Sequence, residues 1–228
     1  MVKRSKRYNK SLEAVSDKPL ALADAVNALQ SMPKAKFDET VEISFKLNVD
    51  PKQSNQMVRG TVRLPNGSGK KVRVVVFTDH AETAVAAGAD KAGLEDLIKE
   101  IEGGWMDFDV AIATTSAMKE VRKLARILGP RGLMPNPKSG TVTDDVEAAI
   151  KEVKGGRVEY KMDKTANLVV IVGKRSFAND KLLENAKAAL ASVAAGRPEV
   201  IKGKFVNSIS ISSTMSPAVK VALSEIAE

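Results

Sequence analysis

Strict alternation of apolar and polar residues, in two parts of the chain far apart, constrains the fold more than any other feature of the sequence. Residues 40–49 place five apolar side chains on one side of a strand: Val41, Ile43, Phe45, Leu47 and Val49. Residues 57–64 alternate in the same way. Side chains two positions apart share a face of a strand, so this pattern predicts an antiparallel sheet with one face in a core and the other in water or on a partner.

The same signal returns after residue 156. RVEYKM and NLVVIVG flank the short turn DKTA, which predicts a hairpin. KFVNSISISST also alternates. One predicted face carries Phe205, Ile209 and Ile211, and the opposite face carries Val206, Ser208, Ser210 and Ser212. Helices are expected at about 19–32, with Asp17 as cap, and at about 178–195.

The residues between these two parts follow a different pattern. KVRVVVF, 71–77, and DVAIATT, 109–115, are nearly continuous apolar runs, as expected of strands that are covered on both faces. Helical patterns follow each run, for example TDDVEAAIKEVKGG. Strands that alternate with helices predict an α/β unit with a largely parallel sheet.

The order of these signals predicts an α/β (α+β) protein of two domains. The first is discontinuous, 1–66 and 157–228, and the second is inserted at 67–156. Glycines at both crossings predict a hinge that allows domain motion: Gly67, Gly69, Gly155 and Gly156. Three sequential units are the alternative, which is less favoured because the last would lack a partner sheet.

The composition of the 228-residue chain favours a polyanionic partner. Lys and Arg number 36 against 28 Asp and Glu, giving a net charge of +8, so nucleic acid is expected first and an anionic membrane second. Five of the charges lie in the first ten residues, which are either a frayed tail or a phosphate-binding arm. There is no cysteine, no apolar run long enough to span a bilayer and no apolar segment after the basic N-terminus, so a cytoplasmic location is expected.

No catalytic, metal or cofactor site is predicted. NGSGKK, 66–71, departs from the phosphate-binding loop pattern twice and indicates a hinge or turn. His80 is expected at a helix start. The acidic pairs at 107/109 and 144/145 could bind Mg²⁺ but are expected to act as caps and helix-dipole partners. A phosphate- or nucleotide-dependent enzyme built on the central α/β domain is the alternative function, and a membrane-surface protein is a third, without a basic amphipathic helix to support it.

The polar side of the predicted antiparallel sheet mixes short hydroxyls with cations. It carries Lys36, Thr40, Glu42, Arg59, Arg63, Ser208, Ser210 and Ser212. Met215 adds an apolar group where the last strand ends. One interpretation is an ordinary solvated face of a sheet. The alternative is a surface that contacts ribose 2′-hydroxyls, because these groups pair with short donors and acceptors.

The segment GPRGLMPNPKSGTV, 129–142, is too apolar for a linker and too rich in proline and glycine for a helix or strand. It resembles the signature of the bacterial large-subunit ribosomal protein L-one family, whose members build the mobile stalk beside the E site. KFDETVEISFKLNVDPKQSNQMVRGTVRLPNGSGK resembles that family's first domain and hinge, and DKTANLVVIVGK and SISISSTMSP resemble its return. The likeness extends over essentially the whole chain.

The resemblance implies a split α/β sandwich with an inserted Rossmann-like three-layer domain. It also implies binding to 23S ribosomal RNA, repression of the operon's own mRNA, and contact with deacylated E-site tRNA, by a protein that is monomeric off the ribosome, without membrane or cofactor. The implied RNA contacts are Lys36, Phe37, Thr40, Glu42, Asp163, Lys164, Ser208, Thr214, Met215 and Ser216. The family usually has glycine where this chain has Ser216.

The segment 129–142 is expected to be a rigid exposed loop. Its prolines restrict φ, and Leu133 and Met134 would pack it to its domain or form an apolar contact. Arg131 and Lys138 would contact phosphates of stalk RNA or of the leaving tRNA. The alternative is a loop that is ordered only to close its domain.

Overall fold

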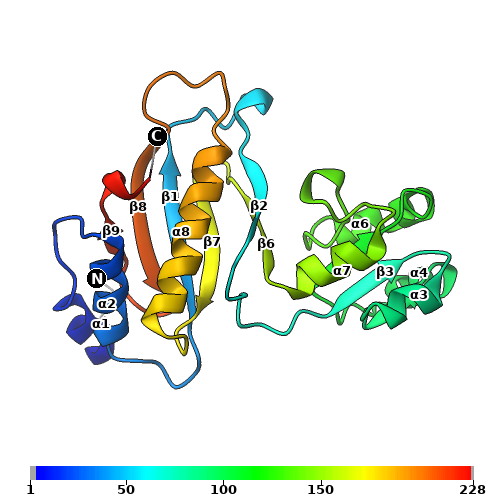
Figure 1. The fold of residues 1–228 in the computed structure, drawn as a ribbon, viewed down its shortest axis with the longest axis horizontal. Coiled ribbons are helices and arrows are strands. Elements are labelled where there is room, and N and C mark those ends of the chain that lie inside the picture. The colour runs from blue at the N-terminus through cyan, green and yellow to red at the C-terminus, as the bar shows by residue number, and fades with distance from the viewer. Residues whose placement is uncertain (1–3, 227–228) are drawn as a thin grey trace. The chain divides into compact units, whose positions relative to one another are not determined.

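The chain divides into two compact units in a computed structural model that describes residues 4–226. Unit 1 comprises Met1–Gly69 and Val158–Glu228, and unit 2 comprises Lys70–Arg157. In Figure 1 unit 1 accordingly combines the two ends of the colour scale, while unit 2 has the colours of the middle of the chain.

Unit 1 is built on a four-stranded antiparallel sheet with the order β7-β1-β8-β9. Its strands are β1 (Thr40–Leu47), β7 (Asn167–Lys174), β8 (Val206–Ser213) and β9 (Val219–Val221). A separate two-stranded sheet pairs β2 (Arg59–Arg63) with β6 (Arg157–Lys161). The helical elements are α1 (Lys6–Leu12), α2 (Leu22–Ser31), α8 (Asn179–Ala195) and the short η1 (Ser54–Gln56) and η4 (Leu223–Glu225).

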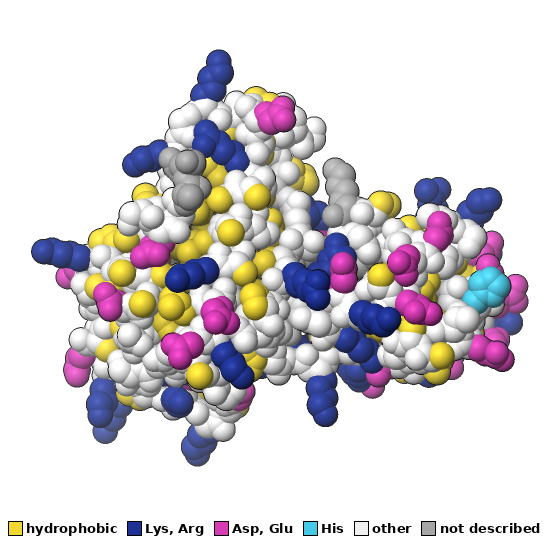
Figure 2. Space-filling model, in the orientation of Figure 1, with side chains coloured by type: hydrophobic (Ala, Val, Ile, Leu, Met, Phe, Trp, Pro, Cys, Tyr) yellow, Lys and Arg dark blue, Asp and Glu magenta, His cyan; other side chains and the backbone are white. Residues whose placement is uncertain are grey.

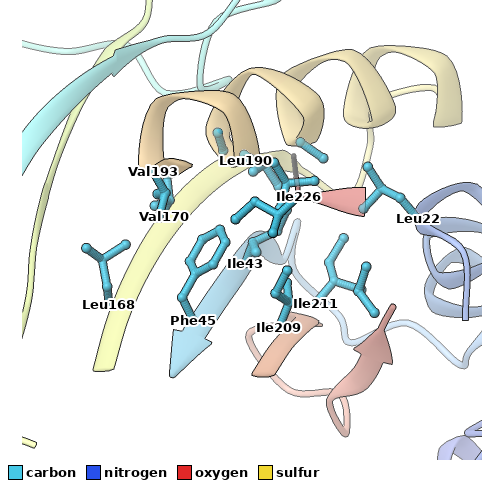
Figure 3. Packing of buried hydrophobic residues seen from close by; sticks show 14 of the residues in the cluster. Leu22, Ile43, Phe45, Leu168, Val170, Leu190, Val193, Ile209, Ile211 and Ile226 are labelled. Atoms are coloured by element: carbon cyan, nitrogen blue, oxygen red, sulfur yellow. The ribbon is translucent and has the colours of Figure 1, made fainter. Parts of the chain in front are cut away.

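The core of unit 1 lies on one face of the four-stranded sheet. The inward side chains of β1 are Val41, Ile43, Phe45 and Leu47, and all are buried. They pack against apolar side chains of α2 and α8, including Leu29 and Leu190. Figure 3 shows Phe45 and Ile43 pointing toward α8. The alternating residues 40–47 therefore form a strand with one face in the core, as the sequence predicts, and the opposite face of the sheet is not covered by helices.

Three local expectations for unit 1 were wrong. β6 and β7 do not form a hairpin, because β6 pairs with β2 and β7 with β1. Val206 is buried rather than on the polar side, because a register shift between Lys46 and Leu47 turns it inward. Asp17 does not cap the second helix, whose N-cap is Ala21 without a side-chain hydrogen bond.

The basic N-terminus is helical from Lys6 to Leu12. Ser5 caps the helix by accepting a hydrogen bond from the backbone nitrogen of Tyr8, and Ser11 is buried. The frayed-tail interpretation is therefore wrong for these residues. Lys3, one of the five basic residues among the first ten, lies outside the described part of the chain.

Unit 2 has three layers around a parallel sheet with the order β4-β3-β5. Its strands are β3 (Val74–Phe77), β4 (Lys91–Gly93) and β5 (Val110–Ala113). Its helical elements are α3 (Ala81–Ala86), α4 (Glu95–Glu102), α5 (Met118–Val121), η2 (Arg122–Leu124), α6 (Ala125–Leu128), η3 (Pro137–Ser139) and α7 (Val146–Lys154).

The continuous apolar run in β3 packs against helices on both faces of this sheet. Val75 and Phe77 belong to the cluster that includes α4, α5 and α6, while Val74 and Val76 belong to the cluster with α3 and α7. All four are fully buried. This arrangement confirms the expected fold class. In the described residues of both units, no helix combines the length and apolarity needed to cross a membrane.

Candidate nucleic-acid interface

The uncovered face of the unit 1 sheet carries short hydroxyls in register with charged and apolar side chains. Strand pairing aligns Ile171, Glu42 and Ser212 across β7, β1 and β8. The next outward row is Val169, Ser44, Ser210 and Lys220, and the last is Asn167, Lys46 and Ser208. The result is a polar surface with a small apolar area at Val169 and Ile171, which are 45% and 39% exposed.

The opposite, helix-covered side of unit 1 faces the viewer in Figures 1 and 2, with α8 in front of the sheet. Acidic and basic side chains are interspersed on it, and they do not form one basic patch. The charge distribution on that side therefore gives no footprint for a polyanion.

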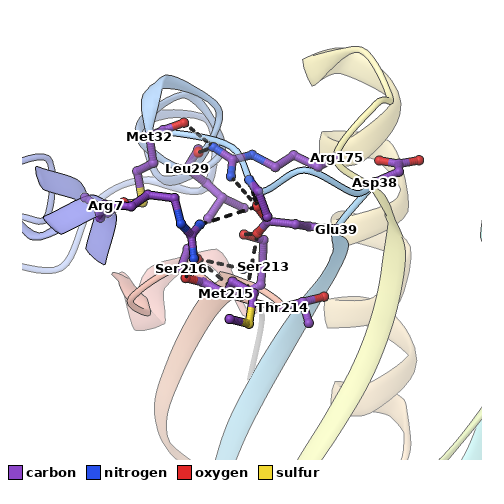
Figure 4. Close-up of polar contacts among 12 residues, drawn as sticks. Arg7, Leu29, Met32, Asp38, Glu39, Arg175, Ser213, Thr214, Met215 and Ser216 are labelled. Atoms are coloured by element: carbon purple, nitrogen blue, oxygen red, sulfur yellow. Dashed lines mark hydrogen bonds and ion pairs between the residues drawn. The ribbon is translucent and has the colours of Figure 1, made fainter. Parts of the chain in front are cut away.

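A buried carboxylate organises one end of the uncovered face. The side chain of Glu39 is fully buried, and it accepts hydrogen bonds from the backbone nitrogens of Ala35 (2.7 Å) and Met215 (3.3 Å). It also accepts from the Ser213 hydroxyl and pairs with Arg175 at 3.2 Å. Figure 4 shows Arg175, Ser213 and Met215 converging on Glu39. Glu39 therefore connects residues 33–39 to the turn after β8.

The charge state of Glu39 follows from these contacts. Burial alone would raise the pKa of this carboxyl. The hydrogen bonds from Ser213, Ala35 and Met215, together with the positive charge of Arg175, outweigh burial and hold the pKa below its ordinary value. Glu39 is ionised at neutral pH and needs a permanent cation beside it.

Arg175 is that cation, and it also completes the end of α2. Its side chain is 2% exposed, and its Nη2 donates to the carbonyls of Leu29 (2.8 Å) and Met32. The last carbonyls of a helix have no partner within the helix. Arg175 therefore satisfies helix-end acceptors and a buried carboxylate at once.

The turn 213–216 presents an exposed methionine on a firmly bonded backbone. The nitrogen of Thr214 donates to the Thr40 carbonyl, and the nitrogen of Thr40 donates to the Thr214 hydroxyl, both at 3.0 Å. Met215 is 49% exposed, and Phe37, on the other segment held by Glu39, is 53% exposed. Neither side chain belongs to the core of unit 1.

Ser216 fits this turn without strain. Its hydroxyl accepts a hydrogen bond from the Ser213 nitrogen at 2.9 Å and lies 3.0 Å from the Pro217 carbonyl. Among the described non-glycine residues, only Ala166 has a positive φ, so position 216 does not require the conformational freedom of glycine. The hydroxyl of Ser216 is engaged within the turn.

Asp163 and Lys164 lie near the other end of β1. The Asp163 carboxylate accepts from the nitrogens of Thr165 and Asn167, both at 2.8 Å. The hydrogen bond from Asn167, followed by that from the Thr165 hydroxyl, lowers the pKa of Asp163 to about 2. Asp163 thus shapes its loop, while Lys164 is exposed.

The predicted RNA contacts of unit 1 therefore form two groups on one sheet. Lys36, Phe37, Thr40 and the turn 214–216 lie at the start of β1, while Asp163, Lys164 and Ser208 lie near its end, where Ser208 pairs with Lys46. Thr40 and Lys46 are separated by about 20 Å at the usual rise of a strand. Glu42 lies between the groups, opposite Ser212.

The loop 129–142 belongs to unit 2. Leu133 and Met134 pack against the cluster of α4, α5 and α6, as one of the expectations had it. The nitrogen of Asn136 donates to the Thr141 hydroxyl at 2.8 Å, and Val142 bridges to Ala113 beside β5. Arg131 is exposed, and the side chain of Lys138 lies outside the described residues. The loop is ordered by its own domain, and its phosphate contacts stay a prediction.

The glycines of the predicted hinge have different surroundings. Gly67, Gly69 and Gly156 have positive φ values of 68°, 74° and 98°, which favours glycine at each. The carbonyl of Gly67 accepts a hydrogen bond from Asn185 at 3.0 Å within unit 1. Gly155 follows the last residue of α7 as its C-cap. The hinge role of these four residues stays a prediction.

The sequence patterns do not identify Glu39, Arg175 and Arg7 as organising residues. One signal is present for Glu39: it precedes Val41 by two positions and so lies on the same inward face of the strand. This position predicts a buried carboxylate, which requires a cation beside it. The cations lie 136 residues later and 32 residues earlier, so the pattern alone does not identify them. His80 lies at the start of α3, as expected.

The fold defines a class of protein: a two-unit α/β protein in which an antiparallel α/β sandwich is interrupted by a parallel α/β unit. A family model described as "Ribosomal protein L1p/L10e family" matches residues 29–217. The chain belongs to this family. It is a ribosomal protein of the large-subunit type and not an enzyme, so the nucleotide-dependent enzyme is excluded.

Full-length relatives support the same assignment. The large ribosomal subunit protein uL1 of Kosmotoga olearia is 48% identical over 231 residues, with 100% of both chains covered. The proteins of the same name from Saccharopolyspora erythraea and Persephonella marina are 49% and 51% identical, and each match covers 97% of this chain and 94% of the relative. The resemblance predicted from the sequence is confirmed.

Proposed function

We propose that this protein binds a folded segment of 23S ribosomal RNA with the open face of unit 1 and forms the mobile stalk of the large subunit in the cytoplasmic ribosome. The observation that carries the proposal is the pair of exposed side chains Phe37 and Met215, whose backbone segments are both held by the buried Glu39. Exposed apolar groups beside rows of serine hydroxyls suit the sugar and base edges of a folded RNA. The contacts would be Lys36, Phe37, Thr40, Glu42, Asp163, Lys164, Ser208, Thr214, Met215 and Ser216.

A competition titration tests this proposal. Labelled bacterial 23S ribosomal RNA is titrated with the protein in the presence of excess tRNA, at about 50 and 200 mM salt. Binding that survives the competitor, and that weakens with salt by a finite slope, supports a specific folded site. Binding that collapses on addition of tRNA would leave only a basic protein with nonspecific affinity.

The two units would have different tasks. Unit 1 would hold the ribosomal RNA, and unit 2 would move on the hinge at Gly67, Gly69, Gly155 and Gly156 and reach deacylated tRNA in the E site through Arg131 and Lys138. Exposure of Arg131 on a loop packed by Leu133 and Met134 supports this contact. Replacing Arg131 and Lys138 with Ala should leave folding unchanged and weaken tRNA crosslinking on the ribosome, and unchanged crosslinking would contradict the contact.

The same surface would repress translation of the protein's own operon. A messenger segment with a fold similar to the ribosomal site would compete for the open face, because one surface cannot hold both. Off the ribosome the protein would be monomeric, since Val169 and Ile171 form only a small apolar area among polar neighbours. Mutual displacement of the two RNAs in a titration tests the first statement, and light scattering tests the second.

A further inference from the structure

The side chain of Arg7 links the N-terminal helix α1 to the border of the candidate interface. Nη2 of Arg7 donates to the carbonyl of Met215 at 3.3 Å, and Nη1 lies 3.8 Å from Oε1 of Glu39. Figure 4 shows Arg7 extending from α1 to the turn 213–216. The contact between Arg7 and Met215 joins residues 208 positions apart, so the position of α1 relative to the turn is a property of the tertiary fold.

The exposed charged side chains within α1 are cationic, and the acidic Glu13 follows at its C-cap. Arg4, Lys6 and Lys10 are exposed, and the first turn contains no acidic residue. Arg4 lies over the ring of Tyr8 at 5.3 Å. Within residues 4–226, neither Lys6 nor Lys10 forms an ion pair. Residues four apart share a helix face, so Lys6 and Lys10 present two unneutralised charges side by side.

A second group of cations, in unit 2, has a different character. Lys70, Arg73 and Lys154 line a hollow together with Asp90. Lys70 pairs with Asp109 at 2.6 Å, and Lys154 lies 3.4 Å from Asp90. Arg73 contacts Asp107 and Asp109. Lys71 also lines the hollow and is exposed. Acidic neighbours neutralise the other three cations, so the hollow offers a polyanion less than α1 does.

We propose that α1 is a phosphate-binding arm of the RNA interface, in which Arg7 positions the helix against the Met215 turn and Lys6 and Lys10 contact backbone phosphates of the bound RNA. This inference rests on the proposed function of unit 1. Because Arg7 contacts the Met215 carbonyl, α1 lies beside any RNA that is seated on Thr214 and Met215. Lysine contacts phosphate as a point charge and releases counterions when it does so.

The test compares two double variants that remove equal charge. Lys6→Ala/Lys10→Ala removes the proposed contacts, and Lys181→Ala/Lys187→Ala removes two exposed lysines from α8, on the helix-covered side of the sheet. Lys6→Arg/Lys10→Arg keeps the charge on α1. Affinity for labelled 23S ribosomal RNA is measured between about 50 and 200 mM salt.

The α1 variant should lose affinity by about tenfold or more near 100 mM salt. Its affinity should also depend less on salt: the magnitude of the slope of log affinity against log salt concentration should decrease by about 1.4 to 1.8. The arginine variant should retain the parent slope. A slope change of the same size in the α8 variant, or an unchanged slope in the α1 variant while the parent binds, would overturn the role of α1 alone. Failure of the parent protein to bind would overturn the proposed function, and this inference with it.

Discussion

The buried carboxylate of Glu39 accepts a hydrogen bond from the backbone nitrogen of Met215, 3.3 Å away, although the two residues are 176 positions apart in the sequence. The same carboxylate accepts from Ala35, next to Lys36 and Phe37. Two segments that carry exposed candidate contacts thus share one buried anchor. The geometry of the candidate interface therefore depends on a residue that has no access to a ligand.

Replacing Glu39 with Gln should destabilise the protein by about 3 kcal/mol, because it leaves Arg175 as a buried charge without its counterion. Urea unfolding measures the change. Glu42→Gln is the matched control, since Glu42 is only half-buried on the outward face, and it should alter the free energy of unfolding by less than about 0.5 kcal/mol. Equal effects of the two substitutions would contradict the assigned role of Glu39.

Met215→Ala should weaken binding to 23S ribosomal RNA and change the free energy of unfolding by less than about 0.5 kcal/mol, because the side chain is half exposed. Phe45→Ala is the contrasting variant: it empties a core position and should cost about 3–5 kcal/mol. Thermal unfolding and RNA titration are measured on both proteins. A large loss of stability in Met215→Ala would show that this side chain supports the fold.

Removing the hydroxyl of Ser216 should loosen the turn that carries Met215. Ser216→Ala leaves the Ser213 nitrogen, which donates to that hydroxyl at 2.9 Å, without its partner, at a cost of about 1–3 kcal/mol. Ser212→Ala, on the outward face of the same strand, is the control. Faster amide exchange at Ser213 and Thr214 in Ser216→Ala alone is the expected result, and identical exchange in both variants would count against it.

The loop after β6 should be sensitive to acid only at very low pH. Hydrogen bonds from Asn167 and Thr165 lower the pKa of Asp163 to about 2, against an ordinary value of 3.8. A depressed folded pKa means that the stabilising contribution of the ionised group is present above about pH 4 and is lost as the pH falls toward 2. Carboxyl and amide NMR titrations should show Asp163, Thr165 and Asn167 changing together near pH 2, and a midpoint near 3.8 would refute these bonds.

The sequence predicts which faces of the strands are buried better than it predicts strand pairing and register. The run in β3 indicates burial on both faces, and the alternation in β1 indicates a one-sided core, because each depends on local periodicity. Val206 departs from its predicted face because the register shift opposite Leu47 is a property of two paired strands. The pairing of β6 with β2 is equally nonlocal.

In the candidate site, too, local sequence signals identify some residues, and others depend on the tertiary fold. Phe37, Thr214 and Met215 were identified from motif resemblance, and the structure places their segments around Glu39. The anchoring roles of Arg7 and Arg175 depend on contacts between residues 208 and 136 positions apart. Periodicity could mark Glu39 as a buried charge, but only the folded chain identifies its partners.

Methyl NMR of methionine tests the central claim most directly. A ¹³C-methyl-methionine sample of the full chain is mixed with a fragment of bacterial 23S ribosomal RNA that contains the stalk segment. The Met215 resonance should shift or broaden, while the resonance of Met57, which is 50% exposed elsewhere in unit 1, stays unchanged. An unchanged Met215 resonance at RNA concentrations that saturate the protein would contradict the assignment of this face as the RNA-binding surface.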